Sequence, residues 1–299
     1  MEPSTALIRR VEINSGKEQY ILTLNSEDFS ALYPGMVRYT LTVTEGERTI
    51  AVFRTNSYEY SPLVPLSAEE ISRRKADEWE REIRSNPMEF VLNHQQKLQK
   101  RSVPPPVDIV VIQGSPRAHG NCSILAGWVV EAAHDLGRHV QVIYPHDMDI
   151  HSCIGCYQCY NTGSCVFNDD MGSIIDAIRS TSLIVVCSPV YTNTVPSGLK
   201  LLIDRCQAYH AERLLSGGIT GQRGLIFSVA GREGEENFTC ITRVISAFFR
   251  NLGIAPVGEI LIDRADAIRD IRTIPGLEHH VQEKVKHHLS MKETAEKQA

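Results

Sequence analysis

The stretch that decides the fold is Val107–Ser123, which reads V-D-I-V-V-I-Q-G-S-P-R-A-H-G-N-C-S. Val107–Gln113 is an almost continuous apolar run, as is typical of a β-strand buried on both faces. A loop of small and polar residues follows, and a helical pattern runs over Ile124–Leu136. A buried strand that passes through such a loop into a helix predicts the first half of a parallel β-α-β unit.

The same alternation continues along the chain. Four more apolar runs predict strands at His139–Tyr144, Leu183–Cys187, Gly224–Val229 and Glu259–Ile262. Helical patterns lie near residues 168–179, 199–206, before 252 and at 276–290. We therefore predict an α/β fold, with a doubly wound five-stranded parallel sheet over residues 104–290 and a disordered tail at 291–299.

Residues 1–103 have a different pattern. Runs at Ala6–Ile13, Gln19–Leu24, Val37–Val43 and Thr49–Phe53 predict a small antiparallel β-module with one solvent-facing side. Residues 67–100 are helical in pattern, and the triple proline at 104–106 marks the domain boundary because it fits neither a helix nor a central strand.

The helical part of this module carries two local signals. Ser67-Ala68-Glu69-Glu70 fits a capping box, in which Ser67 accepts an amide proton and Glu70 reaches back. Pro87 suits the first turn of a second helix. The sequence does not assign a function to residues 1–103. They could form a surface for partner docking or dimerisation, or only a structural β-module with a solvated helical connector.

Composition excludes several classes of protein. The formal charge of −5 predicts no attraction to nucleic acid or to anionic membranes, and no apolar run is long enough to span a bilayer. The N-terminus has no apolar segment of signal-peptide length, so we expect a cytoplasmic protein. Thiols stay reduced there, which favours a metal or redox role for clustered cysteines over disulfides.

Polar and glycine-rich loops follow three of the predicted strands. Ligands bind at the carboxyl ends of the strands in such sheets, so these loops should form one site. The first loop, Gly114–Ser123, leads into a helix and suits a phosphate, or else is only a capped turn. In Ser188–Pro196, Tyr191 could stack on a flat ring, or could be an ordinary aromatic. Ala230–Asn237 gives the weakest signal.

Four of the eight cysteines lie in Ile150–Met171 with the spacing C-x2-C-x2-C-x5-C. A tight coil with this spacing can surround a cubane iron–sulfur cluster, whereas zinc sites more often use two separated C-x2-C pairs. A third alternative is that the cysteines hold no metal. The four candidate ligands are Cys153, Cys156, Cys159 and Cys165. We expect Cys187, Cys206 and Cys240 to be buried apolar filler.

Residues 108–206 resemble the flavodoxin-like NAD(P)H-dependent FMN reductases. The resemblance rests on G-S-P-R-A-H-G-N-C-S at 114–123 and S-P-V-Y at 188–191. With the four cysteines, the chain is more narrowly similar to the iron–sulfur flavoproteins of anaerobes. The similarity extends loosely to residue 264 and does not cover 1–103. One departure is Cys122, where the family usually has threonine, so only the backbone amide is a secure phosphate donor there.

The resemblance implies two cofactors and their ligands. An FMN phosphate would be held by the first loop and the isoalloxazine would be lined by Pro189 to Asn193 of the loop after the third strand. A [4Fe–4S] cluster would be held by the four cysteines, over the flavin. The implied cofactor-binding residues are Ser115, Arg117, Gly120, Asn121, Cys122, Ser123, Pro189, Val190, Tyr191, Thr192, Asn193 and Gly231.

The function expected from the resemblance is an FMN-dependent oxidoreductase in which the cluster exchanges single electrons with a carrier such as ferredoxin. No side chain is expected to act as a catalytic acid or base. Three alternatives remain: a cluster-free FMN or quinone reductase that uses NAD(P)H, an electron carrier or subunit of a larger redox complex, and a flavoprotein that binds zinc. The family also implies a homo-oligomer.

Overall fold

The computed structural model describes residues 4–15, 18–31, 33–61, 66–95, 107–216 and 221–296. Contacts divide the chain into two compact units. The first unit is Met1–Ser102 together with Ile154–Val166, and the second is Val103–Cys153 and Phe167–Ala299. The sequence analysis placed the whole cysteine-bearing stretch in the C-terminal domain, and the structure differs there. The triple proline lies outside the described residues.

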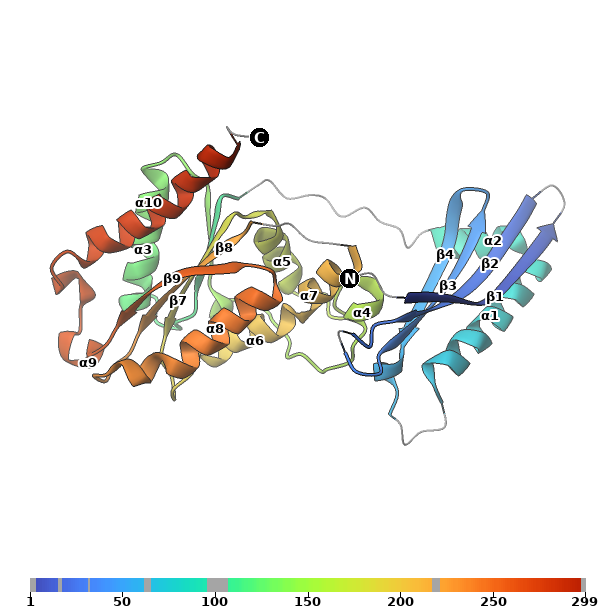
Figure 1. Ribbon diagram of the computed structural model, residues 1–299, viewed down its shortest axis with the longest axis horizontal. Helices are drawn as coiled ribbons and strands as arrows, with labels where there is room; N and C mark the ends of the chain where they lie inside the picture. Colours follow the sequence, from blue (N-terminus) through green and yellow to red (C-terminus); the bar gives the residue numbers. More distant parts are fainter. Residues whose placement is uncertain are drawn as a thin grey trace. The chain divides into compact units, whose positions relative to one another are not determined.

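The second unit contains the predicted parallel sheet, in the order β6-β5-β7-β8-β9 (Figure 1). This is the flavodoxin-like order, with the topological switch point between β5 and β7. The fold class predicted from the sequence is confirmed. The strands are β5 (Ile109–Gln113), β6 (Val140–Ile143), β7 (Leu183–Pro189), β8 (Arg223–Val229) and β9 (Ala255–Ile262).

Helices α3 and α10 cover one face of this sheet, and α6 and α8 lie on the other (Figure 1). Helix α10 continues to Glu296, past the predicted end near Ser290, because neither glycine nor proline interrupts the chain there. The sequence analysis did not predict α7. The main helices are α3 (Asn121–His134), α5 (Met171–Ser180), α6 (Ser197–Arg205), α7 (Gln207–Ser216), α8 (Thr239–Asn251) and α10 (Leu277–Glu296).

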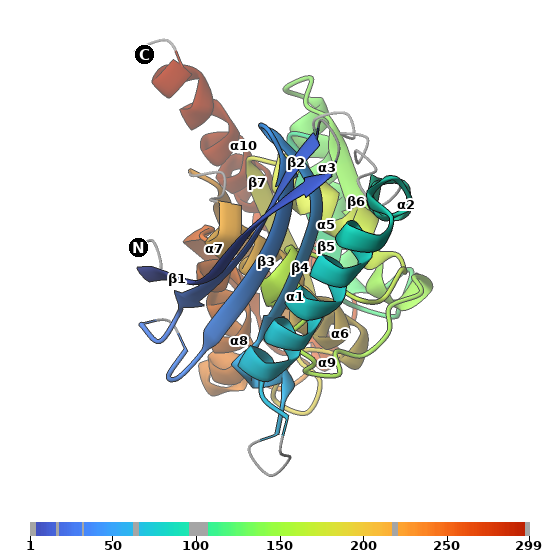
Figure 2. The same cartoon turned by 90° about the vertical axis from the view of Figure 1, so that its right-hand side faces the viewer.

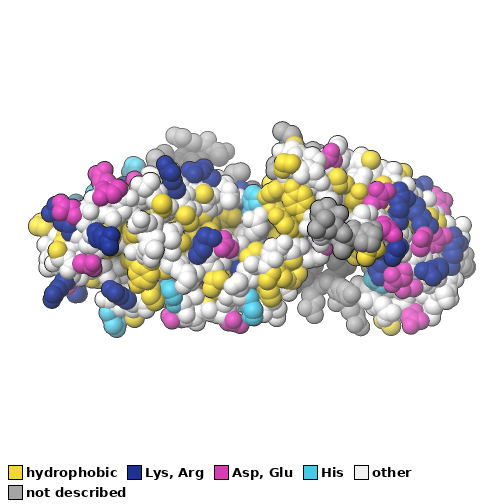
Figure 3. Space-filling model, turned by 90° about the horizontal axis from the view of Figure 1, so that it is seen from below, with side chains coloured by type: hydrophobic (Ala, Val, Ile, Leu, Met, Phe, Trp, Pro, Cys, Tyr) yellow, Lys and Arg dark blue, Asp and Glu magenta, His cyan; other side chains and the backbone are white. Residues whose placement is uncertain are grey.

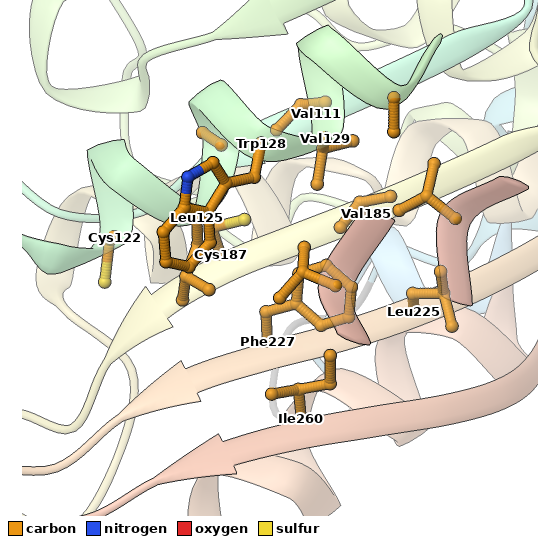
Figure 4. Packing of buried hydrophobic residues seen from close by; sticks show 14 of the residues in the cluster. Val111, Cys122, Leu125, Trp128, Val129, Val185, Cys187, Leu225, Phe227 and Ile260 are labelled. Atoms are coloured by element: carbon orange, nitrogen blue, oxygen red, sulfur yellow. The ribbon is translucent and has the colours of Figure 1, made fainter. Parts of the chain in front are cut away.

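The core between α3, α10 and the sheet is apolar and continuous. Trp128 and Leu125 of α3 pack over the strands that carry Val185 and Phe227 (Figure 4). Burying a side chain of this size stabilises the fold by about 1.5–3 kcal/mol. The core therefore fixes the positions of the strand ends that carry the loops. On the opposite face, a β-carbon at Gly224 would collide with the ring of Phe249.

The first unit contains a four-stranded antiparallel sheet in the order β1-β2-β3-β4, as predicted. Helix α1 (Ala68–Ser85) lies along one face of it, followed by α2 (Pro87–Gln95) (Figure 2). Trp79 packs edge-on against Phe53 and Phe90, with ring centroids 6.4 and 5.6 Å away. The strands are β1 (Ser4–Ser15), β2 (Glu18–Asp28), β3 (Val37–Glu45) and β4 (Arg48–Asn56).

Helix α1 begins as the sequence predicted, except in one detail. The Ser67 hydroxyl accepts the amide proton of Glu70 at 3.2 Å. The Glu70 carboxylate does not reach back but pairs with Arg74 one turn later. On the face of the first unit seen in Figure 3, charges of both signs are interspersed. None of the helices in the described part of the chain is long and apolar enough to cross a bilayer.

Candidate functional site

A cavity of about 1020 Å³ lies at the carboxyl ends of the parallel strands. It is lined by the loops after β5, β7 and β8, which the sequence analysis assigned to one site, and by the segment after β9. Small-molecule and cofactor sites typically occupy about 300–1,000 Å³. Every predicted cofactor-binding residue lines it except Ser123: Ser115, Arg117, Gly120, Asn121, Cys122, Pro189, Val190, Tyr191, Thr192, Asn193 and Gly231.

The buried side chain of Gln113, at the end of β5, organises the first loop. Its Oε1 accepts the Ser115 amide proton at 3.0 Å, and its Nε2 donates to the Ser123 hydroxyl at 2.8 Å. That hydroxyl donates in turn to the carbonyl of Arg117 at 3.0 Å. Ser123 is therefore part of the scaffold of the loop and does not line the cavity. The Ser115 hydroxyl accepts the Arg117 amide proton at 3.2 Å, and its own proton remains available for a ligand.

The N-terminus of α3 opens into the cavity. Gly120 is the N-cap, and the amides of Asn121 and Cys122 lie in the first turn, where a helix offers no internal acceptor. The Asn121 Oδ1 accepts the amide proton of Ile271 at 3.3 Å, which leaves its Nδ2 protons for a ligand. The Cys122 thiol is buried in the core, and burial raises its pKa to about 12. The backbone amide is therefore the group that Cys122 offers to an anion.

The loop after β7 is a tight turn closed by two hydrogen bonds of 2.9 Å between Tyr191 and Thr194. Thr192 and Asn193 occupy its centre with φ of 46° and 59°. Two successive left-handed residues define a type I′ turn, which favours Asn-Gly. A β-branched residue in this conformation is strained, and such strain is concentrated at functional sites. The strained turn lines the cavity.

The β8 and β9 side of the cavity contains residues that the sequence analysis missed. A β-carbon at Gly231 would collide with the carboxylate of Asp266, so the two segments meet closely there. Extending the rule about strand ends to the fifth strand could have identified Ala265, Asp266 and Arg269. Of the lining residues that were not predicted as ligands, His119 lies in the first loop, and Ala230, Arg232 and Asn237 lie in the loop after β8 that was predicted to join the site; Val229, Ala265, Asp266 and Arg269 lie outside the predicted loops.

The charge of the cavity is positive on balance. Arg117, Arg232 and Arg269 line it from three different loops, and Asp266 is the one acidic residue in its described lining. Within the described residues, none of the three guanidinium groups forms an ion pair. An electropositive, polar cavity of this kind suits an anionic ligand.

The cysteine-bearing stretch is divided between the two units. Cys153 belongs to the second unit, and Cys156, Cys159 and Cys165 belong to the first. None of the four is buried or in a disulfide. Among the described residues no three histidine, cysteine, aspartate or glutamate side chains are gathered to hold a metal ion. The four-ligand assignment and the predicted position over the flavin therefore stay predictions.

The other cysteines follow the expectation only in part. Cys187 and Cys206 are buried, as predicted, and burial raises the pKa of the Cys206 thiol to about 12. Cys240 is exposed on α8, so its assignment as buried filler was wrong. It lies in the first turn of an amphipathic helix, on the face turned away from the sheet.

A buried ion pair connects the two chain segments that lie directly before and after the four cysteines. Arg205 donates to both carboxylate oxygens of Asp169 and to the carbonyl of His151. Its guanidinium also lies over the ring of Phe167, which stacks on His151. Burial alone would raise the pKa of Asp169. Hydrogen bonds from Arg205 and from the amides of His151 and Met171 outweigh burial and lower that pKa to about 2.

Comparison with known proteins identifies a family for the second unit. The model of the family described as NADPH-dependent FMN reductase matches residues 107–265. An iron-sulfur flavoprotein of Archaeoglobus fulgidus is 31% identical over 149 residues, which cover 50% of this chain and 65% of that protein. One of Methanosarcina thermophila is 34% identical over 97 residues, which cover 32% of this chain and 51% of that protein.

The family model leaves the N-terminal sheet of this chain uncovered, and the two matches cover less than two thirds of each relative's own length. Among solved structures, an azoreductase of Bacillus anthracis superposes with a TM-score of 0.49 at 9% sequence identity. That superposition covers 60% of this chain and 99% of the azoreductase.

Proposed function

The chain belongs to the NADPH-dependent FMN reductase family, and from this premise we propose that it is an FMN-dependent oxidoreductase with a second redox centre held by four cysteines. The observation that carries the flavin part is the cavity at the switch point of the sheet. It brings together predicted ligands from three loops that are far apart in the sequence. Its positive balance of charge suits the phosphate of FMN.

The residues of the cavity fit the two ends of an FMN molecule. The first-turn amides of α3, the Ser115 hydroxyl, the Asn121 amide and the Arg117 guanidinium offer donors for the phosphate. Pro189–Asn193 would line the ring system of the flavin. The close approach of Gly231 to Asp266 would limit the space for the ring on the β8 and β9 side of the cavity. When bound, FMN supplies one- and two-electron chemistry that no side chain of the cavity can supply.

The part of the protein in this chemistry is to orient the flavin, to exclude water and to set its potential through hydrogen bonds and charge. We assign no catalytic acid or base. A reducing partner such as NAD(P)H or ferredoxin, and an acceptor such as a quinone, remain proposals. A homo-oligomer, implied by the family, and a cytoplasmic location, expected from the sequence, also remain predictions.

Titrating the purified apoprotein with FMN tests the flavin assignment. We expect one FMN per chain, with quenching of flavin fluorescence, and weaker binding of riboflavin because riboflavin lacks the phosphate. A protein that takes up neither ligand would contradict the flavin proposal. Equal affinity for both ligands would contradict the role given to the α3 N-terminus.

The cluster is the finer part of the proposal, and it rests on cysteine spacing and on the names of the relatives. The donor set suits a cubane, and none of the four thiols is locked in a disulfide or buried. Anaerobic purification followed by iron, sulfide and zinc analysis tests it. About four irons and four sulfides per chain are expected for a cubane. Zinc without sulfide would contradict the cluster and indicate a zinc site in its place.

A cluster-free reductase that uses NAD(P)H is the second candidate, and the arginines of the cavity favour it. Arg232 and Arg269 lie on segments other than the one that carries Arg117, so the cavity offers more positive charge than the first loop alone provides. Steady oxidation of NADPH with a quinone by iron-free protein would support this candidate. Flavin reduction only by a reduced ferredoxin would support an electron-transfer role instead.

A further inference from the structure

The N-terminal sheet lies outside the residues that the family model matches. It contacts the cysteine-bearing loop, Ile154–Val166, through a buried polar network. The loop contributes the short helix α4 (Cys159–Thr162), and the sheet contributes the end of β4 and the turn after it. Asn161 is 1% exposed and Asn56 is fully buried. The Asn56 Nδ2 donates to the Asn161 Oδ1 at 2.9 Å and to the Tyr157 carbonyl at 3.3 Å.

Glu59 completes this network from the same turn. Its Oε1 accepts from the Asn161 Nδ2 at 2.5 Å and from the Asn56 amide at 2.7 Å. Its Oε2 accepts from the side chain of Gln158. One carboxylate therefore binds two loop side chains and the strand end at once. Buried polar groups that are this fully paired specify one arrangement, because any other would leave donors or acceptors unsatisfied.

Two arginines of the sheet satisfy the carbonyl end of α4. Arg38 donates to the carbonyl of Tyr160 at 3.1 Å, and Arg54 donates to the carbonyl of Asn161 at 3.3 Å. The last carbonyls of a helix have no internal partner, and positive charge is favourable beside them. Arg38 is held by Glu27 of β2 through two hydrogen bonds of 2.6 and 2.7 Å. The C-cap of α4 itself is Gly163, and the sheet supplies the donors for the carbonyls of Tyr160 and Asn161.

A cluster of four tyrosines closes the interface on its apolar side. Tyr160 packs edge-on against Tyr33 with ring centroids 5.1 Å apart, and their hydroxyls are 2.5 Å apart. Tyr157 packs edge-on against Tyr58 at 5.0 Å. Edge-to-face pairs of this kind add specificity beyond the area that they bury.

The loop has little internal means of holding this shape. Helix α4 has four residues, far fewer than the ~12–15 that an isolated helix needs in water. Tyr157 is held in the left-handed region with φ of 57°, which a non-glycine residue rarely adopts without support. The contacts of the sheet and its adjoining turns therefore add substantially to what holds the loop in this shape.

We propose that the N-terminal sheet is a clamp for the cysteine-bearing loop, and that its function is to hold the segment with Cys156 and Cys159 in one conformation with both thiols partly exposed. Asn56, Glu59, Arg38 and Arg54 are positioning residues in this proposal. The clamping of the loop is independent of the flavin. The use of the held thiols as a redox centre rests on the proposed function.

Amide hydrogen exchange in the full-length protein tests the clamp. In the wild type the amides of Tyr160, Asn161 and Gly163 donate within the loop at 3.0, 3.0 and 2.8 Å, so they report whether α4 is formed. We expect Asn161→Ala to speed the exchange of the Tyr160 and Gly163 amides by about 5- to 30-fold, because it removes two side-chain hydrogen bonds, to Asn56 and to Glu59.

Thr162→Ala is the matched control on the same helix. Thr162 is exposed, and among the described residues its hydroxyl bonds within the loop, to Gln158 and Ser164. This variant should exchange within twofold of the wild type. Asn56→Asp is the reciprocal variant in the sheet, since it keeps the oxygen that accepts the Tyr58 amide proton and loses both donations to the loop. It should speed loop exchange as Asn161→Ala does.

Two outcomes decide the proposal. Unchanged loop exchange in both asparagine variants, with wild-type protection of β2 and β3, would overturn it. If either variant also loosens β2 and β3, Arg54→Ala decides, because Arg54 contributes a single hydrogen bond to the loop. Loop exchange at least threefold faster in Arg54→Ala, with intact strands, supports the clamp, and a smaller change contradicts it.

A second readout separates the clamp from the proposed function. Alkylation rates of Cys156 and Cys159 in metal-free protein should rise in Asn161→Ala, with exposed Cys240 as the internal standard. If the cysteines hold a cluster, the same variant should lose iron and keep its FMN. Faster alkylation in a protein that never binds iron would support the clamp and contradict only the cluster.

Discussion

Arg205 and Asp169 form a two-pronged ion pair, 2.6 and 3.0 Å long, in which both side chains are 1% exposed. Asp169 follows Cys165, the last of the four cysteines, and Arg205 also binds the carbonyl of His151, which precedes Cys153, the first of them. The pair therefore joins the two segments of the second unit that flank Ile154–Val166, the part of the chain that belongs to the first unit. A flexible loop does not by itself keep its two ends at a fixed distance, so an ion pair between the flanking segments helps to hold these ends together.

Asp169→Asn should destabilise the protein strongly, because it leaves the Arg205 guanidinium buried without its counter-charge. Removing one partner of a buried pair costs about 3–5 kcal/mol. Urea unfolding followed by circular dichroism measures the change. The control is Asp204→Asn, which breaks the half-exposed pair with Lys200 and should cost no more than about 0.5 kcal/mol. Equal effects of the two variants would contradict the structural role given to Arg205.

The same pair predicts a pH dependence of stability. The pKa of Asp169 is about 2 in the folded protein, below its ordinary value of 3.8. A lowered carboxylate pKa contributes stability above the unfolded pKa, and this contribution is lost as the pH falls through the folded value. The advantage of wild type over Asp169→Asn should therefore narrow by about 1 kcal/mol between pH 6 and pH 3. A constant difference would show that the carboxylate is not held charged.

Arg117→Gln should weaken FMN binding while leaving the fold intact. Arg117 lines the cavity on the first loop and forms no ion pair within the described residues. Losing a charge-assisted contact with the phosphate should raise the Kd by about 10- to 100-fold. Riboflavin affinity, measured on the same variant by fluorescence quenching, should not change. Arg272→Gln is the control, because Arg272 pairs with Asp270 outside the cavity.

Substitution by alanine should change the stability of the protein in opposite directions at two glycines of the second unit. At Gly224 a β-carbon would meet the buried ring of Phe249, so Gly224→Ala should destabilise by about 1–3 kcal/mol. At Gly127, inside α3, nothing lies within 4 Å of the added atom. Gly127→Ala should stabilise by about 0.5–1 kcal/mol through helix propensity. Thermal unfolding of both variants checks the signs, and a gain in stability for Gly224→Ala would show that Phe249 can move aside.

The turn at Thr192 and Asn193 should be stabilised by residues that prefer its geometry. Thr192→Asn combined with Asn193→Gly creates the Asn-Gly pair favoured in type I′ turns. Relief of the strain should raise the unfolding free energy by about 1 kcal/mol. If the Thr192 side chain contacts the flavin, FMN affinity should fall at the same time. Lower stability in this double variant would show that the turn is not strained in the wild type.

The sequence was informative wherever local chemistry was sufficient. The apolar run at Val107–Gln113, with the loop and helix that follow it, predicted the parallel sheet. The rule that ligands bind at strand ends brought Arg117 and Tyr191 to one cavity. These predictions worked because a buried parallel strand and a phosphate loop each have a composition set by their immediate neighbours.

The errors have physical reasons. Ser123 was predicted as a ligand, but Gln113 and the Arg117 carbonyl take up its hydroxyl. Cys240 was predicted to be buried, and the hydrophobic pattern of α8 turns it outward. Arg269 was missed because it follows the last strand, where no glycine-rich loop signals a site. Each error depended on which way a side chain points, which composition does not encode.

The sequence by itself determined the sheet, the loops that line the cavity and the cysteine spacing, because these are set by residues close together in the chain. Only the tertiary structure decided which neighbours surround each of them. Asn56 and Asn161 are 105 positions apart, and no local pattern predicts that their side chains meet. Hydrogen bonds between such distant residues depend on the complete fold. For that reason the contact of the N-terminal sheet with the cysteine-bearing loop became visible only in three dimensions.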